Sequence, residues 1–406
     1  MANLFDYLTW RGDLPLTLVP LGEADAALLA MLCYNDMGDL AATAEGLFLR
    51  DVAVYADACN KPANDLARRR LDALYAMAAS RRFEGLRICR YVNRRDTAAR
   101  VQFSAMTAVT GDGAVLICFR GTDSTLVGWR EDFDMSYETV PAQEAAVRYL
   151  AETAAVLPGP ILLTGHSKGG NLAFYASAHA DEATQARIAA AYSFDGPGLD
   201  PATSAGEGYQ HVEDRLKLYI PQSSVVGLLM DAHDRRQVVR SDAVGLMQHD
   251  VFSWQMSGPL FERAKETTFS SQLLDKSLHD WLNQATREQR HSFVDGVFRL
   301  LEASGAATTA EMKTLLVRNA PNVIQAGIDM DPDARRMLAQ LAGRFVGLTT
   351  TNAWDMTLGE KWNQFTRAVS AAAGEVQKGI ADALQSRQPQ PPPEPDVPKI
   401  EVPKES

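Results

Sequence analysis

Cysteine is scarce in this sequence, with only four in 406 residues. The four lie far apart and lack the C-x-x-C spacing that a zinc or redox site would need: Cys33, Cys59, Cys89 and Cys118. Four cysteines are also too few to cross-link a chain of this length. The sequence therefore predicts no metal centre and no disulfide framework. Cys118 stands in an apolar run and is expected to be a buried thiol.

Long apolar runs are missing as well. No stretch reaches the ~18 apolar residues of a membrane-spanning helix, so no transmembrane segment is expected. Asp6, Arg11 and Asp13 interrupt the apolar residues at the start of the chain, a pattern that is not typical of a signal peptide. These two absences make the cytoplasm the expected location.

The chain also has no excess of positive charge. It contains 40 Lys and Arg against 51 Asp and Glu, a net charge of −11. This balance argues against nucleic acid as a partner and against a polybasic membrane anchor. Apolar residues make up 46% of the sequence and charged residues 22%. Such a chain must bury a large core, which excludes a disordered or fibrous protein.

Strand and helix patterns alternate through the middle of the sequence. Short apolar runs predict strands at 86–92, 100–109, 114–119, 161–164, 188–194, 216–220 and 237–240. Amphipathic stretches predict helices at 142–157 and 168–179. Strands that alternate with helices in this way predict the α/β class, with a mostly parallel sheet and helices on both faces.

Helical periodicity dominates on both sides of this alternating region. One helix is expected near 62–80, and another begins after the acidic turn at 23–25. Toward the C-terminus, apolar residues from 362 to 384 recur at three- and four-residue steps, and the last nineteen residues hold seven of the nineteen prolines. The expected domains are an N-terminal helical segment packed on the core (1–84), an α/β core (85–264), a helical C-terminal extension (265–387) and a disordered, proline-rich tail (388–406).

The sharpest local signal is a serine between a strand pattern and a helix pattern. Residues 161–175 read ILLTGHSKGGNLAFY, a G-x-S-x-G motif in which Ser167 follows an apolar strand and precedes an amphipathic helix. Such a turn forces the serine into a strained conformation and holds its hydroxyl above the sheet. Gly165 and Gly169 fit because side chains there would collide with the neighbouring strand and helix. Ser167 is the predicted nucleophile; the alternative is an ordinary turn with an exposed serine.

A second glycine turn follows a strand at residues 115–124, which read VLICFRGTDS. Acyl transfer needs fixed donors for the oxyanion. The backbone N–H of Lys168, at the start of a helix where N–H groups favour negative charge, is one predicted donor. The backbone N–H of Thr122, aided by its hydroxyl, is the other. The alternative is a strand-ending turn stabilised by Asp123 or Ser124.

These motifs resemble those of a known family. FRGTD at 119–123 and GHSKGG at 165–170 are similar to the motifs of class-three lipases, which are serine hydrolases of the α/β-hydrolase fold. With FDGPG, PQSSVVG and QHDVFSWQ, the sequence more closely resembles an uncharacterised bacterial family of lipase-like proteins. The resemblance covers about residues 1–260. It implies Ser167 as the nucleophile and Thr122 as an oxyanion donor.

A serine nucleophile needs a base, and an acid that orients it. His249 follows the last predicted strand among apolar residues, where this fold places its base. A core histidine bonded to backbone is the alternative. His166, inside the serine turn, is expected to be buried and hydrogen-bonded instead.

The acid is less clearly marked. Asp195 ends a predicted strand at the carboxyl edge of the sheet, where catalytic groups gather, and it matches the pattern of pancreatic-type lipases. Class-three lipases use an aspartate one strand later, but residues 222–225 here read QSSV and hold no carboxylate. Asp195 is the predicted acid, with Asp231 in reserve. A structural Asp195 that only caps its turn is the alternative.

Lys168 stands in the first turn of a helix, where its charge opposes the helix dipole. An ion pair with Asp123, Glu131 or Asp132 would explain it. The other interpretation is that Lys168 faces the substrate and favours a carboxylate or phosphate.

The predicted function is cleavage of carboxylic esters, with a small-molecule or lipid ester as substrate, through an acyl-enzyme on Ser167. No cofactor and no metal are required. The alternative is an inactive hydrolase fold that acts as a binding or scaffold protein, which the missing carboxylate near Ser224 and the helical extension favour. The extension could also pair with a partner helix or a second copy of the chain.

Overall fold

The computed structural model describes residues 1–96, 101–122, 135, 139–230 and 236–269, together with scattered residues between 271 and 335. Backbone contacts divide the chain into two units, Met1–Thr351 and Asn352–Ser406, and every described residue belongs to the first. The tail (388–406), the apolar stripe at 362–384 and most of the predicted extension (265–387) lie outside the described residues. The predicted domain boundaries stay predictions.

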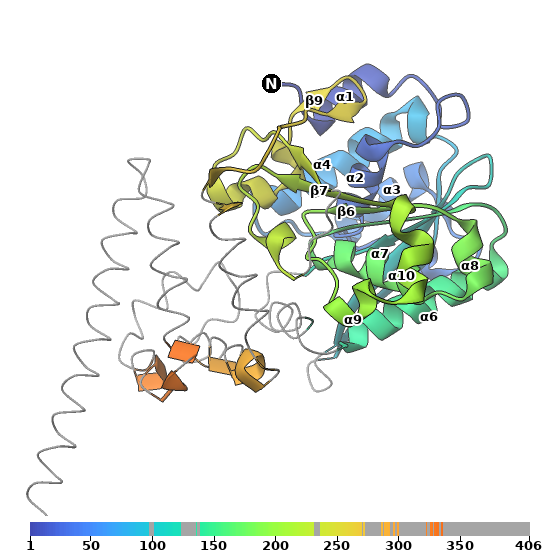
Figure 1. Cartoon of the computed structure of the whole chain (residues 1–406). Helices are drawn as coiled ribbons and strands as arrows, with labels where there is room; N and C mark the ends of the chain where they lie inside the picture. The colour runs from blue at the N-terminus through green and yellow to red at the C-terminus, as the bar shows by residue number, and fades with distance from the viewer. Residues whose placement is uncertain are drawn as a thin grey trace, which may run out of the picture. The chain divides into compact units, whose positions relative to one another are not determined.

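A mixed sheet forms the centre of the first unit (Figure 1). In the described part of the chain, its eight strands follow one another in sequence order: β1 Leu47–Phe48, β2 Arg87–Asp96, β3 Val101–Val109, β4 Val115–Phe119, β5 Ile161–His166, β6 Ile188–Phe194, β7 Leu216–Pro221 and β8 Gln237–Val239. Strands β1 to β4 pair antiparallel, and β4 to β8 pair parallel. Each predicted strand is present within a few residues of its expected bounds. The parallel half surrounds the predicted serine turn.

The crossover helices cover one face of the sheet. They are α6 Pro141–Val156, α7 Lys168–His179, α8 Glu182–Arg187, α9 Pro201–Ser204 and α10 Glu207–Val212. Since parallel strands that follow one another are joined by right-handed crossovers, helices between sequential strands lie on the same side. Val115 and Ile117 of β4 point to this side and pack in one apolar cluster with Leu150 of α6 and Leu172 of α7.

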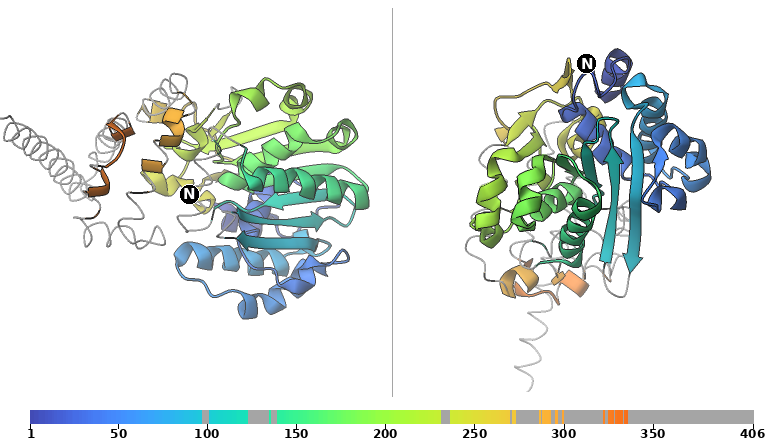
Figure 2. Two further views of the ribbon diagram at one scale, coloured as in Figure 1. Left: turned by 90° about the horizontal axis from the view of Figure 1, so that it is seen from below. Right: turned by 90° about the vertical axis from the view of Figure 1, so that its right-hand side faces the viewer.

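The N-terminal helices cover the opposite face (Figure 2). They are α1 Leu4–Arg11, α2 Glu23–Leu32, α3 Leu49–Cys59 and α4 Asp65–Ala79. Every residue of α2 is buried, and its apolar side chains pack in one cluster with Leu116 and Cys118, the alternate residues of β4. Cys118 is therefore buried as expected. The predicted α/β class with helices on both faces is confirmed, and the N-terminal helices supply the second layer.

Two buried acidic residues fix α2 against the rest of the unit. Asp25 pairs with Arg82, 2.5 Å from carboxylate oxygen to guanidinium nitrogen, and both side chains are about 1% exposed. Glu23 accepts a hydrogen bond from the Tyr219 hydroxyl at 2.9 Å and pairs with Arg263 at 2.7 Å. These contacts hold the N-terminal end of α2; Tyr34, beside the predicted active site, follows the other end of this helix.

The last described elements form the region that carries His249. A short hairpin, β9 Met256–Ser257 and β10 Leu260–Phe261, follows two 3-10 turns at Gly245–His249 and Val251–Ser253. Within the described ranges, no helix combines the length and the apolar character needed to cross a membrane.

Candidate active site

Ser167 occupies the sharp turn between β5 and α7. Its backbone angles are φ 57° and ψ −132°, a conformation that residues other than glycine rarely adopt. The Ser167 N–H donates to the Phe194 carbonyl at 3.0 Å, and the Ser167 carbonyl accepts from the Gly170 N–H at 2.8 Å. Such strain costs about 1–3 kcal/mol and is concentrated at functional sites.

Two glycines make this turn possible. A Cβ on Gly165 would collide with the backbone of Gly169, and a Cβ on Gly169 would collide with the carbonyl group of Phe119. These are the collisions with helix and strand that the motif predicts. A strained serine between a central parallel strand and the next helix, on a sheet with helices on both faces, defines an α/β-hydrolase fold.

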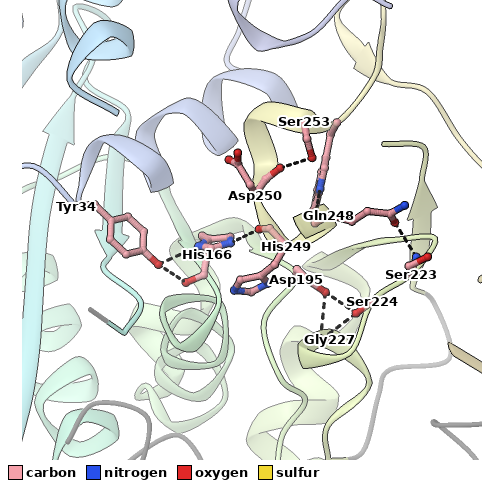
Figure 3. Close-up of polar contacts among 11 residues, drawn as sticks. Tyr34, His166, Asp195, Ser223, Ser224, Gly227, Gln248, His249, Asp250 and Ser253 are labelled. Atoms are coloured by element: carbon pink, nitrogen blue, oxygen red, sulfur yellow. Dashed lines mark hydrogen bonds and ion pairs between the residues drawn. The ribbon is translucent and has the colours of Figure 1, made fainter. Parts of the chain in front are cut away.

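Asp195 and His249 meet at the carboxyl edge of the sheet (Figure 3). Asp195 directly follows β6, and its side chain is 1% exposed. Its Oδ2 lies 2.6 Å from Nδ1 of His249, whose side chain is 31% exposed. The structure thus brings the predicted acid and base together. Asp231, the reserve acid, lies outside the described residues.

The second oxygen of Asp195 is held by the loop after β7. Oδ1 accepts a hydrogen bond from the Ser224 hydroxyl at 2.5 Å and another from the Gly227 N–H at 3.1 Å. A Cβ on Gly227 would approach this oxygen to 2.6 Å, so the backbone comes this close only at a glycine. Residues 222–225, QSSV, hold no carboxylate of their own. The structure shows that Ser224 there supports the carboxylate of Asp195.

His166 ties the base to the nucleophile turn. Its Nε2 lies 2.8 Å from the His249 carbonyl oxygen, which only accepts, so Nε2 carries the proton. Nδ1 is then free to accept from the Tyr34 hydroxyl at 2.9 Å. The rings of His166 and His249 are 4.4 Å apart between centroids. The predicted buried, hydrogen-bonded His166 is therefore present, and it places His249 beside the residue that precedes Ser167.

The titration of His166 gives a testable pH dependence. Burial lowers the pKa of His166 well below its usual value, and the charges of His249 and Arg70 lower it further. The unfolded chain then binds more protons than the folded one once the pH falls below about 6.5. We expect the free energy of unfolding to fall by up to about 1.4 kcal/mol per pH unit below that value, until His166 itself protonates.

Urea denaturation between pH 7 and pH 4.5 measures this slope. His166→Gln removes the titrating ring and keeps a donor for the His249 carbonyl, so its slope should be shallower than that of the wild type. His211→Gln, at an exposed position, is the matched control and should keep the wild-type slope. Equal slopes in the wild type and His166→Gln would contradict a neutral, buried His166.

Further contacts fix the loop that carries His249. The Trp254 indole N–H donates to the Gln248 carbonyl at 2.7 Å. The Gln248 side chain accepts from the Ser223 N–H at 2.7 Å and donates to the Ala243 carbonyl at 2.9 Å. Asp250 pairs with Arg69 of α4. Contacts with both the N-terminal helices and the loop after β7 therefore hold the loop of His249 in place.

The predicted oxyanion donors flank the nucleophile. Lys168 is the first residue of α7, and the N–H groups of a first helical turn have no acceptor within the helix. Thr122 follows Gly121, where a Cβ would lie 3.1 Å from the Ser167 Cβ. Ser167 is 7% exposed. Its hydroxyl forms no hydrogen bond with the residues that the structure describes. Catalytic hydrogen bonds often form fully only when substrate binds.

The Lys168 side chain points into the protein. It is 1% exposed, and its ammonium donates to the Gln102 carbonyl at 3.2 Å. This burial does not fit the interpretation in which Lys168 faces the substrate. The three acidic residues expected to pair with it lie outside the described residues: Asp123, Glu131 and Asp132.

Two solved lipase structures are similar to part of this chain. The first, described as M37 lipase, is 14% identical over 50% of this chain and 68% of its own, with a TM-score of 0.30. The second, a triacylglycerol lipase from Penicillium expansum, is 11% identical over 46% of this chain and 77% of its own, with a TM-score of 0.27. The order of the strands and the strained serine turn show the fold independently of these two structures.

The remaining comparisons concern families and curated proteins. No curated protein matches the chain. One family model, described as Mbeg1-like, matches residues 77–299 and so includes Ser167, Asp195 and His249. Since this match covers more than half of the chain, the protein belongs to the Mbeg1-like family.

Proposed function

We propose that this protein is a lipase-type serine hydrolase that cleaves carboxylic esters. The observation that carries the proposal is the hydrogen bond between Asp195 and His249, which lies beside the strained turn of Ser167. A carboxylate, an imidazole and a serine at a strand-to-helix turn are the groups that acyl transfer requires. The chain order of the three residues, Ser, Asp, His, is that of the α/β-hydrolases.

In the proposed reaction, Ser167 Oγ attacks the acyl carbonyl while Nε2 of His249 takes the hydroxyl proton. The carbonyl electron pair moves onto oxygen, where the backbone N–H groups of Lys168 and Thr122 stabilise the negative charge. Collapse of this intermediate breaks the ester bond, and His249 returns the proton to the leaving alcohol. Water then attacks the acyl-enzyme by the same steps and releases the acid.

Asp195 orients the base throughout this cycle. Its Oδ2 accepts the Nδ1–H of His249, which leaves Nε2 unprotonated and able to take the serine proton. Ser224 and Gly227 hold its other oxygen, so the carboxylate cannot rotate away. His166 holds the His249 backbone from the other side. The proposed base is therefore fixed at its ring and at its main chain.

The alternative function, an inactive fold used as a scaffold, was favoured by the missing carboxylate at 222–225. The contact between Ser224 and Asp195 removes that reason, because a carboxylate reaches the same place from the neighbouring strand. Most of the helical extension that also favoured a scaffold lies outside the described residues. An inactive scaffold would leave Ser167 unreactive toward an activity-based probe.

A fluorophosphonate probe tests the proposal, because it modifies a serine only where a base activates it. We expect one adduct on the intact wild-type protein, located at Ser167 by peptide mass spectrometry. The adduct should disappear in Ser167→Ala and remain in Ser223→Ala, a nearby serine that the proposed mechanism does not use. A folded wild-type protein that gains no mass would favour the scaffold.

A further inference from the structure

Two arginines near the active site carry buried nitrogen atoms that have no hydrogen-bond partner among the described residues: Nε and Nη2 of Arg120 and Nε of Arg70. The hydroxyls of Tyr91 and Ser104 are also buried and interact with each other. Arg120 is 8% exposed, Tyr91 6% and Ser104 1%. Neither arginine forms an ion pair with a described residue. Buried polar groups are nearly always paired, so three unpartnered guanidinium nitrogens in one region call for a physical explanation.

The four side chains share one side of the sheet. Alternate residues of β4, Leu116 and Cys118, face the N-terminal helices, and Arg120 continues this alternation. The Arg120 N–H donates to the Ser104 carbonyl at 3.0 Å, which places the neighbouring end of β3 against it. Tyr91 of β2 packs in the same apolar cluster as Leu116.

The charge of Arg120 acts on both Tyr91 and Arg70. Burial raises the pKa of Tyr91, and the charge of Arg120 opposes that rise. Burial lowers the pKa of Arg70; the charge of Asp250 offsets part of this effect, and the charge of Arg120 adds to it. The two guanidinium charges therefore repel each other inside the N-terminal layer. Burying unpaired charges is costly, and an anion between them would offset that cost.

A continuous line of contacts joins this cluster to the nucleophile. The Arg70 guanidinium lies over the Tyr34 ring, with Cζ 3.7 Å from the ring centroid. The Tyr34 hydroxyl lies against Gly121, because a Cβ there would collide with it. The same Cβ would lie 3.1 Å from the Ser167 Cβ. Arg120 therefore directly precedes Gly121, the residue that lies against the Ser167 turn.

We propose that Arg70 and Arg120, with the hydroxyls of Tyr91 and Ser104, bind a phosphate group of the ester substrate. The inference rests on the proposed function and adds a substrate class to it: esters whose alcohol carries a phosphate. Adjacent Nε and Nη2 of one arginine bind two oxygens of a phosphate side by side. Three guanidinium N–H donors beside a hydroxyl pair suit the three terminal oxygens of a phosphate better than the two of a carboxylate.

A matched pair of substrates tests the proposal: butyryl glycerol and butyryl glycerol phosphate, which share the acyl group and the alcohol. We expect a higher kcat/KM for the phosphate ester in the wild type. Arg120→Met and Arg70→Met should each lower the ratio of the two kcat/KM values by about 10- to 100-fold, as expected for the loss of hydrogen bonds to a charged group. Arg68→Met, an exposed arginine on the same helix as Arg70, should keep the ratio.

Thermal unfolding with inorganic phosphate provides a readout that needs no turnover. Phosphate should raise the Tm of the wild type and of Ser167→Ala, and raise it less in Arg120→Met. Loss of a buried, unpaired charge is not expected to prevent folding. Arg120→Lys, which keeps the charge but not the paired donors, is the second variant and should also lose selectivity.

The outcomes separate the two proposals. Equal kcat/KM values for both esters, with an Arg120-dependent Tm shift, would overturn the substrate assignment in favour of a free anion. Equal values without a Tm shift would overturn the anion site and leave water as the partner of these groups. If neither ester is cleaved, the proposed function fails, and an Arg120-dependent Tm shift would still support the phosphate site.

Discussion

Ser167→Ala is expected to lower kcat for ester hydrolysis by about 10⁴- to 10⁶-fold, because the substitution removes the atom that forms the acyl-enzyme. The remaining rate would come from the oxyanion donors and from substrate binding. Steady-state hydrolysis of p-nitrophenyl butyrate measures the loss. A variant that keeps more than a few per cent of the wild-type kcat would contradict a nucleophilic role for Ser167.

A second substitution, Ser167→Gly, tests whether the backbone at this position is strained. Alanine keeps the strain of φ 57°, whereas glycine adopts this conformation without a steric penalty. Ser167→Gly should therefore be as inactive as Ser167→Ala but more stable, by about 1–2 kcal/mol in the free energy of unfolding. Equal stabilities would show that the backbone at Ser167 is not strained.

Asp195→Asn is expected to lower kcat by about 10⁴-fold, with a small effect on KM. The buried amide oxygen can still accept from Ser224 and Gly227, so the turn keeps its shape. The amide NH₂ then faces Nδ1 of His249 and forces the ring proton onto Nε2. In that tautomer His249 cannot take the proton of Ser167.

Two companion variants distinguish orientation of the base from a general loss of negative charge. Asp250→Asn changes the carboxylate next to His249 in the chain and should leave kcat within a few-fold of the wild type. Ser224→Ala removes one hydrogen bond from Asp195 and should lower kcat by about tenfold, in line with the free energy of one such bond. A full loss of activity in Asp250→Asn, together with an active Asp195→Asn, would show that Asp195 is not the acid of this site.

The serine turn and its neighbours could be predicted from the sequence because their determinants are local. Helix α7 at 168–179 and strand β6 at 188–194 begin and end where the pattern of apolar residues predicts. Gly165 and Gly169 mark a turn whose close backbone contacts span only a few residues. The alternation of strands and helices likewise indicated the α/β class before any contact was known.

The partners of the site could not be predicted in this way. Asp195 and His249 are 54 residues apart, and their hydrogen bond depends on the loop at 245–253, which the N-terminal layer and the loop after β7 hold in place. The sequence shows that residues 222–225 hold no carboxylate, but not that Ser224 binds Asp195, and it leaves Asp231 as a reserve candidate for the acid. Which polar groups meet is decided by chain segments that are distant in sequence, and periodicity carries no information about such pairs.

The sequence by itself determined the α/β class, the strands of the parallel half and the turn that carries Ser167, since each depends on neighbouring residues. Tertiary structure alone decided that helices α1 to α4 cover the second face of the sheet. That packing places Tyr34 against His166 and Arg70 over the Tyr34 ring. These contacts join segments up to 132 residues apart. They exist because sequential right-handed crossovers leave one sheet face bare, and a bare apolar face must be covered.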